Sequence, residues 1–526
     1  MRIARWSVLL VLAAPFFFTS VFGQSAREST LVIGADLSDL ITMDPGVSYE
    51  FSGSLIVNNL YETLVKFEGD DLSEVKPGLA ESWEVGEQEG GSTLTFTLRD
   101  ATFASGNPVT ARDVVYSFDR VIELESPSSF LLSDVAGLEV GSTVAVDDKT
   151  VELTLPEGVN PTIVLNLLTF NVGGVVDSQV AQENEQDGDF GSAWLTENSA
   201  GSGPYTLVRW DRGAQVALEA NENASQSGSI SRVILRNIQE SSAQRSALES
   251  NEIDVAYDLT PEAFKAADGD ERFAALPTDT FVLSYLGMNS GEGQPFADNR
   301  VRQAVRYALD QDGIVDELLG GLGRKMQTII PAGLFGANEK VFYEQNPERA
   351  KELLTEAGVG DGLSVEFLVP TGSCFGGVPC ADLAAKVQSD LAAVGIQAEI
   401  RQTVEAELLD IYRAQEAELV LINWSPDYPD PDGNATPMAD FGAQSLAWRN
   451  VWENADASQL AQQAASETDL DARAALYDEL TTLVAEEGPY AILFQPSKPV
   501  VTLATVTDFV RTAQGNVDFT AVSKTE

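Results

Sequence analysis

The chain of 526 residues contains no histidine. This absence excludes every Ser-His-Asp or Cys-His nucleophile and every histidine-ligated metal site. Catalysis by carboxylates alone, as in a secreted glycoside hydrolase, stays compatible with the composition, and so does pure binding. No spacing among the 81 Asp and Glu residues singles out a carboxylate pair. We therefore expect no enzymatic activity and keep the hydrolase as a remote alternative.

Basic residues are scarce. The 32 Lys and Arg residues stand against 81 Asp and Glu, which gives a formal net charge of −49. Nucleic acids and anionic membranes both require a basic face, so we expect neither as a partner. A salt-adapted surface and a compositional habit of the lineage both explain the acidity, and neither indicates a function.

Long apolar runs are lacking outside the N-terminus. Arg2 and Arg5 precede a short apolar run, Val8 to Phe18, and we expect residues 1–23 to be a cleavable secretory signal peptide. The run is too short for a comfortable membrane span, although an uncleaved anchor is the alternative. No cysteine near the cut supports a lipoprotein. The sequence thus predicts an exported, periplasmic protein.

Only two cysteines are present, Cys374 and Cys380, in the stretch SCFGGVPC. Because an exported protein meets oxidising conditions, we expect a local disulfide between them. The bridge closes a short loop and should add little global stability. Its expected effect is to stiffen the loop; two free thiols are the alternative.

Two kinds of segment follow one another along the chain. In the first half, the alternation of Leu94, Phe96 and Leu98 predicts a half-buried antiparallel strand, and a second alternating run follows at 151–155. Ser54 to Val65 and Ser241 to Glu249 are predicted helices. After about residue 286, long capped helices begin, with Asn299 and Asn346 as predicted N-caps.

The most regular stretch alternates strands and helices, which predicts a parallel βαβαβ unit with right-handed crossovers. The predicted strands cover 364–369, 397–401 and 418–423, and the predicted helices cover 381–394 and 404–415. A last helix, Leu470 to Glu486, precedes a return strand at Tyr490 to Phe494.

Two unusual loops follow strands of this unit. The first is Pro370 to Cys380, and the second is Trp424 to Asn434, WSPDYPDPDGN. In an open parallel sheet, ligands bind beyond the carboxyl ends of the strands. Prolines preset the backbone and aromatic rings offer apolar faces, so both loops are predicted to edge one ligand crevice.

Several motifs resemble one known family. The stretch LTFTLRDATFASGNPVTARDVVYSF, Leu94 to Phe118, is similar to the diagnostic segment of the solute-binding proteins of bacterial ABC importers, family 5, which bind oligopeptides, dipeptides or nickel. Further matches occur along the chain in family order, two before this stretch and four after it: NNLYETLVKF, PGLAESWEV, GSGPYTLVRW, NRVRQAVRYALD, NPERAKELLTEAG and WSPDYPDPD. One departure is Ala104-Ser105, where the family often has a His-Asp pair. Gly106, Pro108 and Asp113 are expected to make a turn and a helix cap.

The resemblance implies an α/β, two-lobed periplasmic-binding-protein fold of type II, with an extra subdomain and mixed sheets that contain βαβ units. Residues 24–276 would form lobe I, including an extra subdomain at about 70–195, and residues 277–494 would form lobe II. Residues 495–526 would return to lobe I. Ligand would lie between the lobes and favour closure, because it contacts both only in the closed form.

The resemblance also implies a ligand-binding residue. In peptide-binding members, an Asp three residues after the loop Trp pairs with the peptide's α-ammonium, and Asp427 stands three residues after Trp424. Trp424, Tyr428 and Phe375 are the other expected ligand contacts. A solvated or turn-capping Asp427 and packing of the rings beneath the loop are the alternatives. Asp430 and Asp432 are expected to be turn or hinge residues.

The sequence therefore predicts an exported substrate-binding protein that delivers peptides to an ABC permease in the cytoplasmic membrane. Dipeptide-binding members of the family place an Arg in the loop after the matching first strand to hold the ligand carboxylate. Pro370 to Cys380 has no Arg or Lys, so this departure from the resemblance favours an oligopeptide over a dipeptide. An oligosaccharide or another small solute is the alternative ligand, and sensing is an alternative to import. We expect a monomer without cofactor. We also expect no metal site, since DPDGN lacks the spacing of a calcium loop.

Overall fold

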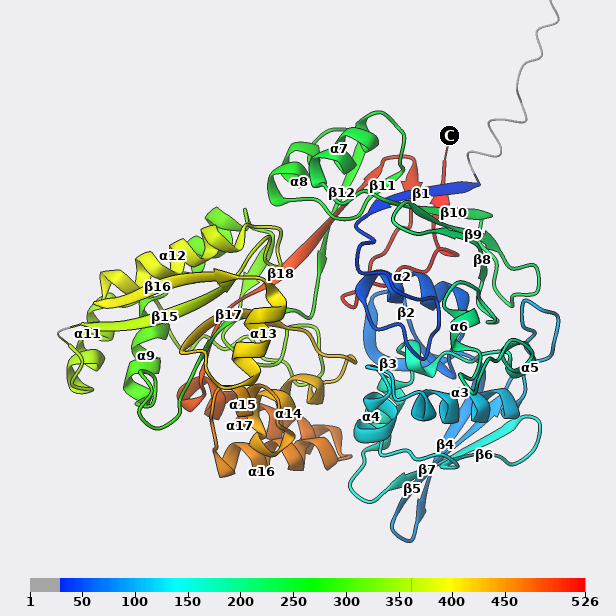
Figure 1. The fold of residues 1–526 in the computed structure, drawn as a ribbon, viewed down its shortest axis with the longest axis horizontal. Helices are drawn as coiled ribbons and strands as arrows, with labels where there is room; N and C mark the ends of the chain where they lie inside the picture. Colours follow the sequence, from blue (N-terminus) through cyan, green and yellow to red (C-terminus); the bar gives the residue numbers. More distant parts are fainter. Residues whose placement is uncertain (1–28, 361, 526) are drawn as a thin grey trace, which may run out of the picture.

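The computed structural model describes residues 29–360 and 362–525 and forms two lobes (Figure 1). The expected signal peptide, residues 1–23, lies outside the described residues. Within them, no helix is both long enough and apolar enough to cross a membrane.

The N-terminal lobe is built on one half of a twelve-stranded sheet. Strand β1 (Thr30–Ala35) pairs in parallel with β10 (Arg232–Asn237) and β11 (Val255–Ala256). Antiparallel strands β9 (Gln215–Ala220) and β8 (Tyr205–Asp211) extend the sheet beyond β10. The helices of this part are α2 (Phe51–Leu60), α5 (Ser178–Glu183), α6 (Ser192–Leu195), α7 (Ser241–Glu249) and α8 (Pro261–Ala267).

A four-stranded antiparallel sheet forms a separate layer of the N-terminal lobe. Its order is β4 (Ala80–Gln88), β5 (Gly91–Leu98), β7 (Thr150–Pro156) and β6 (Thr143–Ala145). Leu94, Phe96 and Leu98 are buried, which confirms the predicted alternation. Helix α3 (Ala111–Glu123) lies over this sheet, and α4 (Pro161–Leu167) lies beside it (Figure 1).

The predicted cap of α3 is confirmed, and it involves Thr110 as well as Asp113. Thr110 is the N-cap residue, and its backbone N–H donates to the Asp113 carboxylate at 2.9 Å, which completes a capping box. Gly106 has a φ of +94°, as the predicted turn requires.

The C-terminal lobe contains the predicted parallel unit. Strands β16 (Ile396–Thr403), β15 (Leu363–Pro370) and β17 (Leu419–Trp424) are parallel neighbours. The connecting helices are α12 (Cys380–Ala393) and α13 (Glu405–Arg413), so the βαβαβ prediction is confirmed. Strand β13 (Leu283–Met288) continues the sheet as an antiparallel neighbour of β17. The other helices are α9 (Asn299–Ala308), α10 (Gln311–Gly313), α11 (Pro347–Glu356), α14 (Asp432–Ala439), α15 (Leu446–Arg449), α16 (Ala455–Ser466) and α17 (Leu470–Glu487).

Strand β18 (Tyr490–Leu503) is shared by the two lobes and runs between them (Figure 1). Its first part pairs with β13 and with β14 (Gly323–Lys325), and its last part pairs with β11 and β12 (Phe273–Asp279). The sequence predicted a strand that ends at Phe494, but the chain stays extended for nine more residues because β11 and β12 supply new partners. The predicted domain boundary 276/277 falls inside β12, and the boundary 494/495 falls inside β18. Both boundaries stay a proposal.

Two local predictions were wrong. The predicted helix Ser54 to Val65 ends at Leu60, since the chain turns extended at Tyr61 and then forms the hairpin of β2 (Val65–Glu68) and β3 (Asp71–Pro77). Asn299 is the first residue of α9, and its N-cap is Asp298, whose carboxylate accepts from the N–H of Arg300 at 2.8 Å. The N-cap at Asn346 is confirmed.

Candidate ligand site between the two lobes

Two loops of the C-terminal lobe meet one short segment of the N-terminal lobe. The loops, 371–379 and 425–431, follow β15 and β17 at the carboxyl ends of these parallel strands. The segment comprises Tyr49, Glu50 and Phe51 and leads into α2. Asp427 contacts Tyr49, and Phe375 contacts Phe51. The structure therefore brings together two predicted site residues and two aromatic residues that sequence reasoning missed.

Asp427 is a sheltered carboxylate with a neutral partner. The Tyr49 hydroxyl donates a hydrogen bond to its Oδ1. No Lys or Arg among the described residues pairs with it. Burial raises the pKa of Asp427 above its ordinary value, and the bond from Tyr49 offsets only part of that rise. A carboxylate in this position is more stable when a cation lies beside it.

Tyr49 is held by aromatic rings of its own lobe. The ring centroids of Phe130 and Phe170 lie 6.4 and 6.1 Å from that of Tyr49, and both contacts are edge-on. Burial raises the pKa of Tyr49, and the nearby Asp427 charge raises it further. Tyr49 therefore remains a hydrogen-bond donor rather than an acid at neutral pH.

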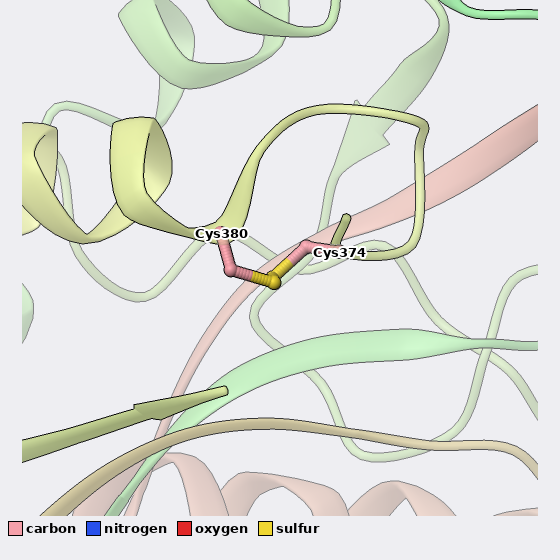
Figure 2. The surroundings of a disulfide bond; sticks show 2 residues. All are labelled: Cys374 and Cys380. Atoms are coloured by element: carbon pink, nitrogen blue, oxygen red, sulfur yellow. A yellow bond between two sulfur atoms is a disulfide. The ribbon is translucent and has the colours of Figure 1, made fainter. Parts of the chain in front are cut away.

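The disulfide loop supplies the second contact. Cys374 and Cys380 form the predicted disulfide, with their Cα atoms 4.9 Å apart (Figure 2). Between them, the N–H of Cys374 donates to the carbonyl of Val378 at 2.8 Å, and Gly376 has a φ of +94°. The bridge thus closes a tight turn that presents Phe375, whose ring centroid lies 6.1 Å from that of Phe51.

Trp424 and Tyr428 pack beneath the loop in this conformation. The Trp424 indole N–H donates to the carbonyl of Gly433 at 2.9 Å. Tyr428 is 4% exposed and lies in the buried cluster of the N-terminal lobe that includes Leu64. Its hydroxyl donates to Asp432 Oδ2 at 2.7 Å. Both rings shape the loop, and their contact with a ligand stays a prediction.

Asp430 anchors the same loop to both lobes. Its carboxylate accepts two bonds from Arg473, at 2.6 and 3.0 Å, and both side chains are 1% exposed. Asn166 of the N-terminal lobe donates to Asp430 at 3.1 Å. The N–H of Asp432 also donates to Asp430, at 2.9 Å, as expected of a turn residue. The loop that carries Asp427 is therefore firmly positioned.

No group of three or more His, Cys, Asp or Glu side chains suited to a metal ion occurs in the part of the chain that the structure describes. The site instead combines a sheltered carboxylate with aromatic rings from both lobes. Such an arrangement suits an organic ligand that carries a cationic group.

Sequence comparison matches residues 74–445 to the model of the bacterial extracellular solute-binding proteins, family 5. A probable D,D-dipeptide-binding periplasmic protein of Escherichia coli (strain K12) is 27% identical over 508 residues, which cover 95% of this chain and 94% of that protein. A di/tripeptide-binding protein of Pseudomonas aeruginosa (strain UCBPP-PA14) is 28% identical over 466 residues, 85% of this chain and 86% of that protein.

Solved structures share the fold. A periplasmic binding protein of Helicobacter pylori in complex with the peptide STSA superposes with a TM-score of 0.78 at 23% identity, over 96% of this chain and 100% of that chain. HbpA2 of Haemophilus parasuis gives a TM-score of 0.81 at 24% identity, over 94% of this chain and 100% of that chain. The two-lobed α/β fold predicted from the sequence is confirmed.

Proposed function

Since the chain belongs to family 5 of the bacterial extracellular solute-binding proteins, we propose that it binds peptides outside the cytoplasm and delivers them to an ABC permease. Relatives that cover at least 85% of this chain are named for dipeptides or di/tripeptides, which supports a peptide ligand. The protein acts as a binding protein without catalysis in this proposal.

The observation that carries the proposal is the environment of Asp427. Its carboxylate is sheltered between the lobes, and its only hydrogen-bond donor among the described side chains is the neutral hydroxyl of Tyr49. A peptide's α-ammonium supplies the positive charge that this carboxylate lacks. The ammonium therefore binds beside Asp427 and either shares or displaces the Tyr49 hydroxyl.

Closure of the lobes follows from the same contacts. Tyr49 and Phe51 belong to the N-terminal lobe, whereas Asp427 and Phe375 belong to the C-terminal lobe. A ligand at this place contacts both lobes only when they are closed, so it shifts the population toward the closed form. The permease would then recognise the closed form.

Two observations bear on peptide length. The loop 370–380 has no Arg or Lys to bind a terminal carboxylate at a fixed short distance, which favours peptides longer than a dipeptide. The names of the relatives favour two or three residues. We propose oligopeptides as the main ligands and make length an outcome of the experiment.

Native mass spectrometry of the protein as purified from its own host tests the proposal, with the denatured extract analysed in parallel. A series of peptide masses is the expected result, and their lengths settle the preferred size. A single sugar-like mass, or another discrete non-peptide mass, would overturn the peptide proposal in favour of a different solute.

A second measurement tests the role of Asp427. Calorimetry compares peptides that carry a free N-terminus with the same peptides acetylated at the N-terminus. Acetylation removes the ammonium and should weaken binding about 10- to 100-fold. Equal affinities for both forms would show that the site does not recognise the ammonium.

A further inference from the structure

Arg511 is a buried cation whose hydrogen-bonding capacity is not used up. It lies between β19 (Val506–Thr507) and β20 (Ser523–Lys524) and is 7% exposed. Its Nε donates to the Tyr257 hydroxyl at 3.0 Å. Its Nη1 is buried and has no hydrogen-bond partner among the described residues. A guanidinium stays charged at all working pH values, and a buried unpaired donor is costly.

No carboxylate forms an ion pair with Arg511 within the described part of the chain, although the sequence has 81 acidic residues against 32 basic ones and the nearby Asp258 carboxylate feels its charge. The acid beside it, Asp258, forms an ion pair with Lys498 at 2.6 Å. Arg511 and Lys498 both lie over the ring of Tyr257, at 5.3 and 5.6 Å from its centroid. This group of residues therefore carries two positive charges and one negative charge.

The turn that follows Arg511 fixes the guanidinium in place. The Tyr257 hydroxyl donates to the carbonyl of Gly515, so the same hydroxyl links the arginine to its own turn. Asn58 of α2 donates to Asn516 at 3.0 Å, which docks the turn on the helix. Gly515 has a φ of +91°, and a Cβ there would lie 3.1 Å from Arg511 Nη2. Glycine thus leaves the space that the guanidinium occupies.

The turn also places Arg511 at the candidate site. A Cβ at Gly515 would lie 3.9 Å from the ring of Phe51, and Phe51 contacts Phe375 of the opposite lobe. Two residues before Phe51, Tyr49 contacts Asp427. Arg511 and Asp427 therefore flank the segment 49–51, with the Arg511 cation on the N-terminal lobe and the Asp427 anion on the C-terminal lobe.

We propose that Arg511 binds a carboxylate of the ligand, so that the site recognises a peptide by both of its charges. With Nε engaged by Tyr257, Nη1 is the donor that lacks a partner on the protein, and in this proposal the carboxylate supplies it. Arginine is the side chain best suited to carboxylate recognition, because its planar donors match the two oxygens. This inference rests on the proposed function. It supplies from the C-terminal segment the cation that the loop 370–380 lacks, so the composition of that loop alone then sets no preference for peptide length.

Competition among defined peptides tests the inference. Pools of peptides of two to five residues, made both as free acids and as C-terminal amides, are incubated with the full-length protein, and retained peptides are quantified by mass spectrometry. The wild-type protein should retain free acids about 10- to 100-fold over amides. In Arg511→Gln that ratio should fall to near one, and in Arg511→Lys, which keeps the charge, part of it should remain.

Matched variants and peptides separate the possible results. Arg112→Gln removes an exposed arginine of the same lobe and should leave the ratio unchanged. Amidated peptides with Glu in place of Gln distinguish a side-chain carboxylate from the terminal one, and a preference that Arg511→Gln abolishes supports the inference in either case. Equal retention of acids and amides by the wild type, or an unchanged ratio in Arg511→Gln, would overturn it. Failure to retain any peptide would instead contradict the proposed function.

Discussion

Replacement of Asp427 with asparagine should lower ligand affinity without lowering stability. The carboxylate has no cationic partner among the described residues, and burial raises its pKa. Removing its charge therefore relieves a desolvation cost in the free protein, and the melting temperature should be unchanged or higher. The bound α-ammonium, in contrast, loses its counter-charge, which costs about 2–5 kcal/mol, or roughly 30-fold to several thousand-fold in Kd.

Calorimetry and thermal denaturation of the same preparations measure the two effects. Asp410→Asn is the matched control, because Asp410 is an exposed carboxylate on the same lobe, and both its Kd and its melting temperature should equal those of the wild type. Unchanged affinity of Asp427→Asn for peptides with a free N-terminus would refute the assignment. A large fall in melting temperature would show that Asp427 supports the fold instead.

Three further results are expected. Affinity for peptides with a free N-terminus should rise with pH through the raised pKa of Asp427 in the free protein and then level off, because a bound ammonium lowers that pKa and binding at lower pH releases a proton. Calorimetric titrations from pH 4 to 7, where the peptide's α-ammonium stays charged, measure this rise, and N-acetylated peptides should show no such dependence. Arg473→Met should lower the free energy of unfolding by about 3–5 kcal/mol, since it leaves the Asp430 carboxylate buried without its cation. Urea titration measures the loss, and a variant as stable as the wild type would contradict a stabilising role for the Arg473–Asp430 pair. Reduction of Cys374–Cys380 should lower stability by no more than about 2 kcal/mol, because only six positions separate the cysteines, and urea titrations with and without reductant measure the difference.

Local patterns were sufficient to predict much of the fold. Leu94, Phe96 and Leu98 alternate because one face of β5 is buried, and the parallel unit could be read from the alternation of strands and capped helices. The course of β18 could not be predicted in this way. Its residues after Phe494 are extended because they pair with β12, which lies more than 200 residues away in the sequence, and local composition carries no record of such a partner.

The candidate site could be proposed from the sequence only in its C-terminal-lobe part. Asp427 and Phe375 lie in loops of unusual composition, so their sequence surroundings indicate a specialised role. Tyr49 and Arg511 have ordinary neighbours along the chain, and only their positions in the fold connect them with the candidate site. Tyr49 contacts the Asp427 carboxylate across the two lobes, whereas Arg511 Nη1 has no hydrogen-bond partner among the described residues.

The two charges also explain how a ligand could drive closure. Closing the lobes without ligand shelters Asp427 beside a neutral hydroxyl, while Arg511 keeps a buried Nη1 unpaired. A zwitterionic peptide supplies a partner to each, and a hydrogen bond to a charged group contributes about 1.5–3 kcal/mol. The ligand already makes one of these bonds in the open form, so closure gains the other, about 1.5–3 kcal/mol, which is part of the roughly 5.5 kcal/mol that shifts a two-state equilibrium from 1:99 to 99:1. A ligand with only one of the two charges makes its charged bond on one lobe in either form and gains none of this energy on closure. In the proposed mechanism, recognition of both charges therefore makes closure specific for a zwitterionic peptide.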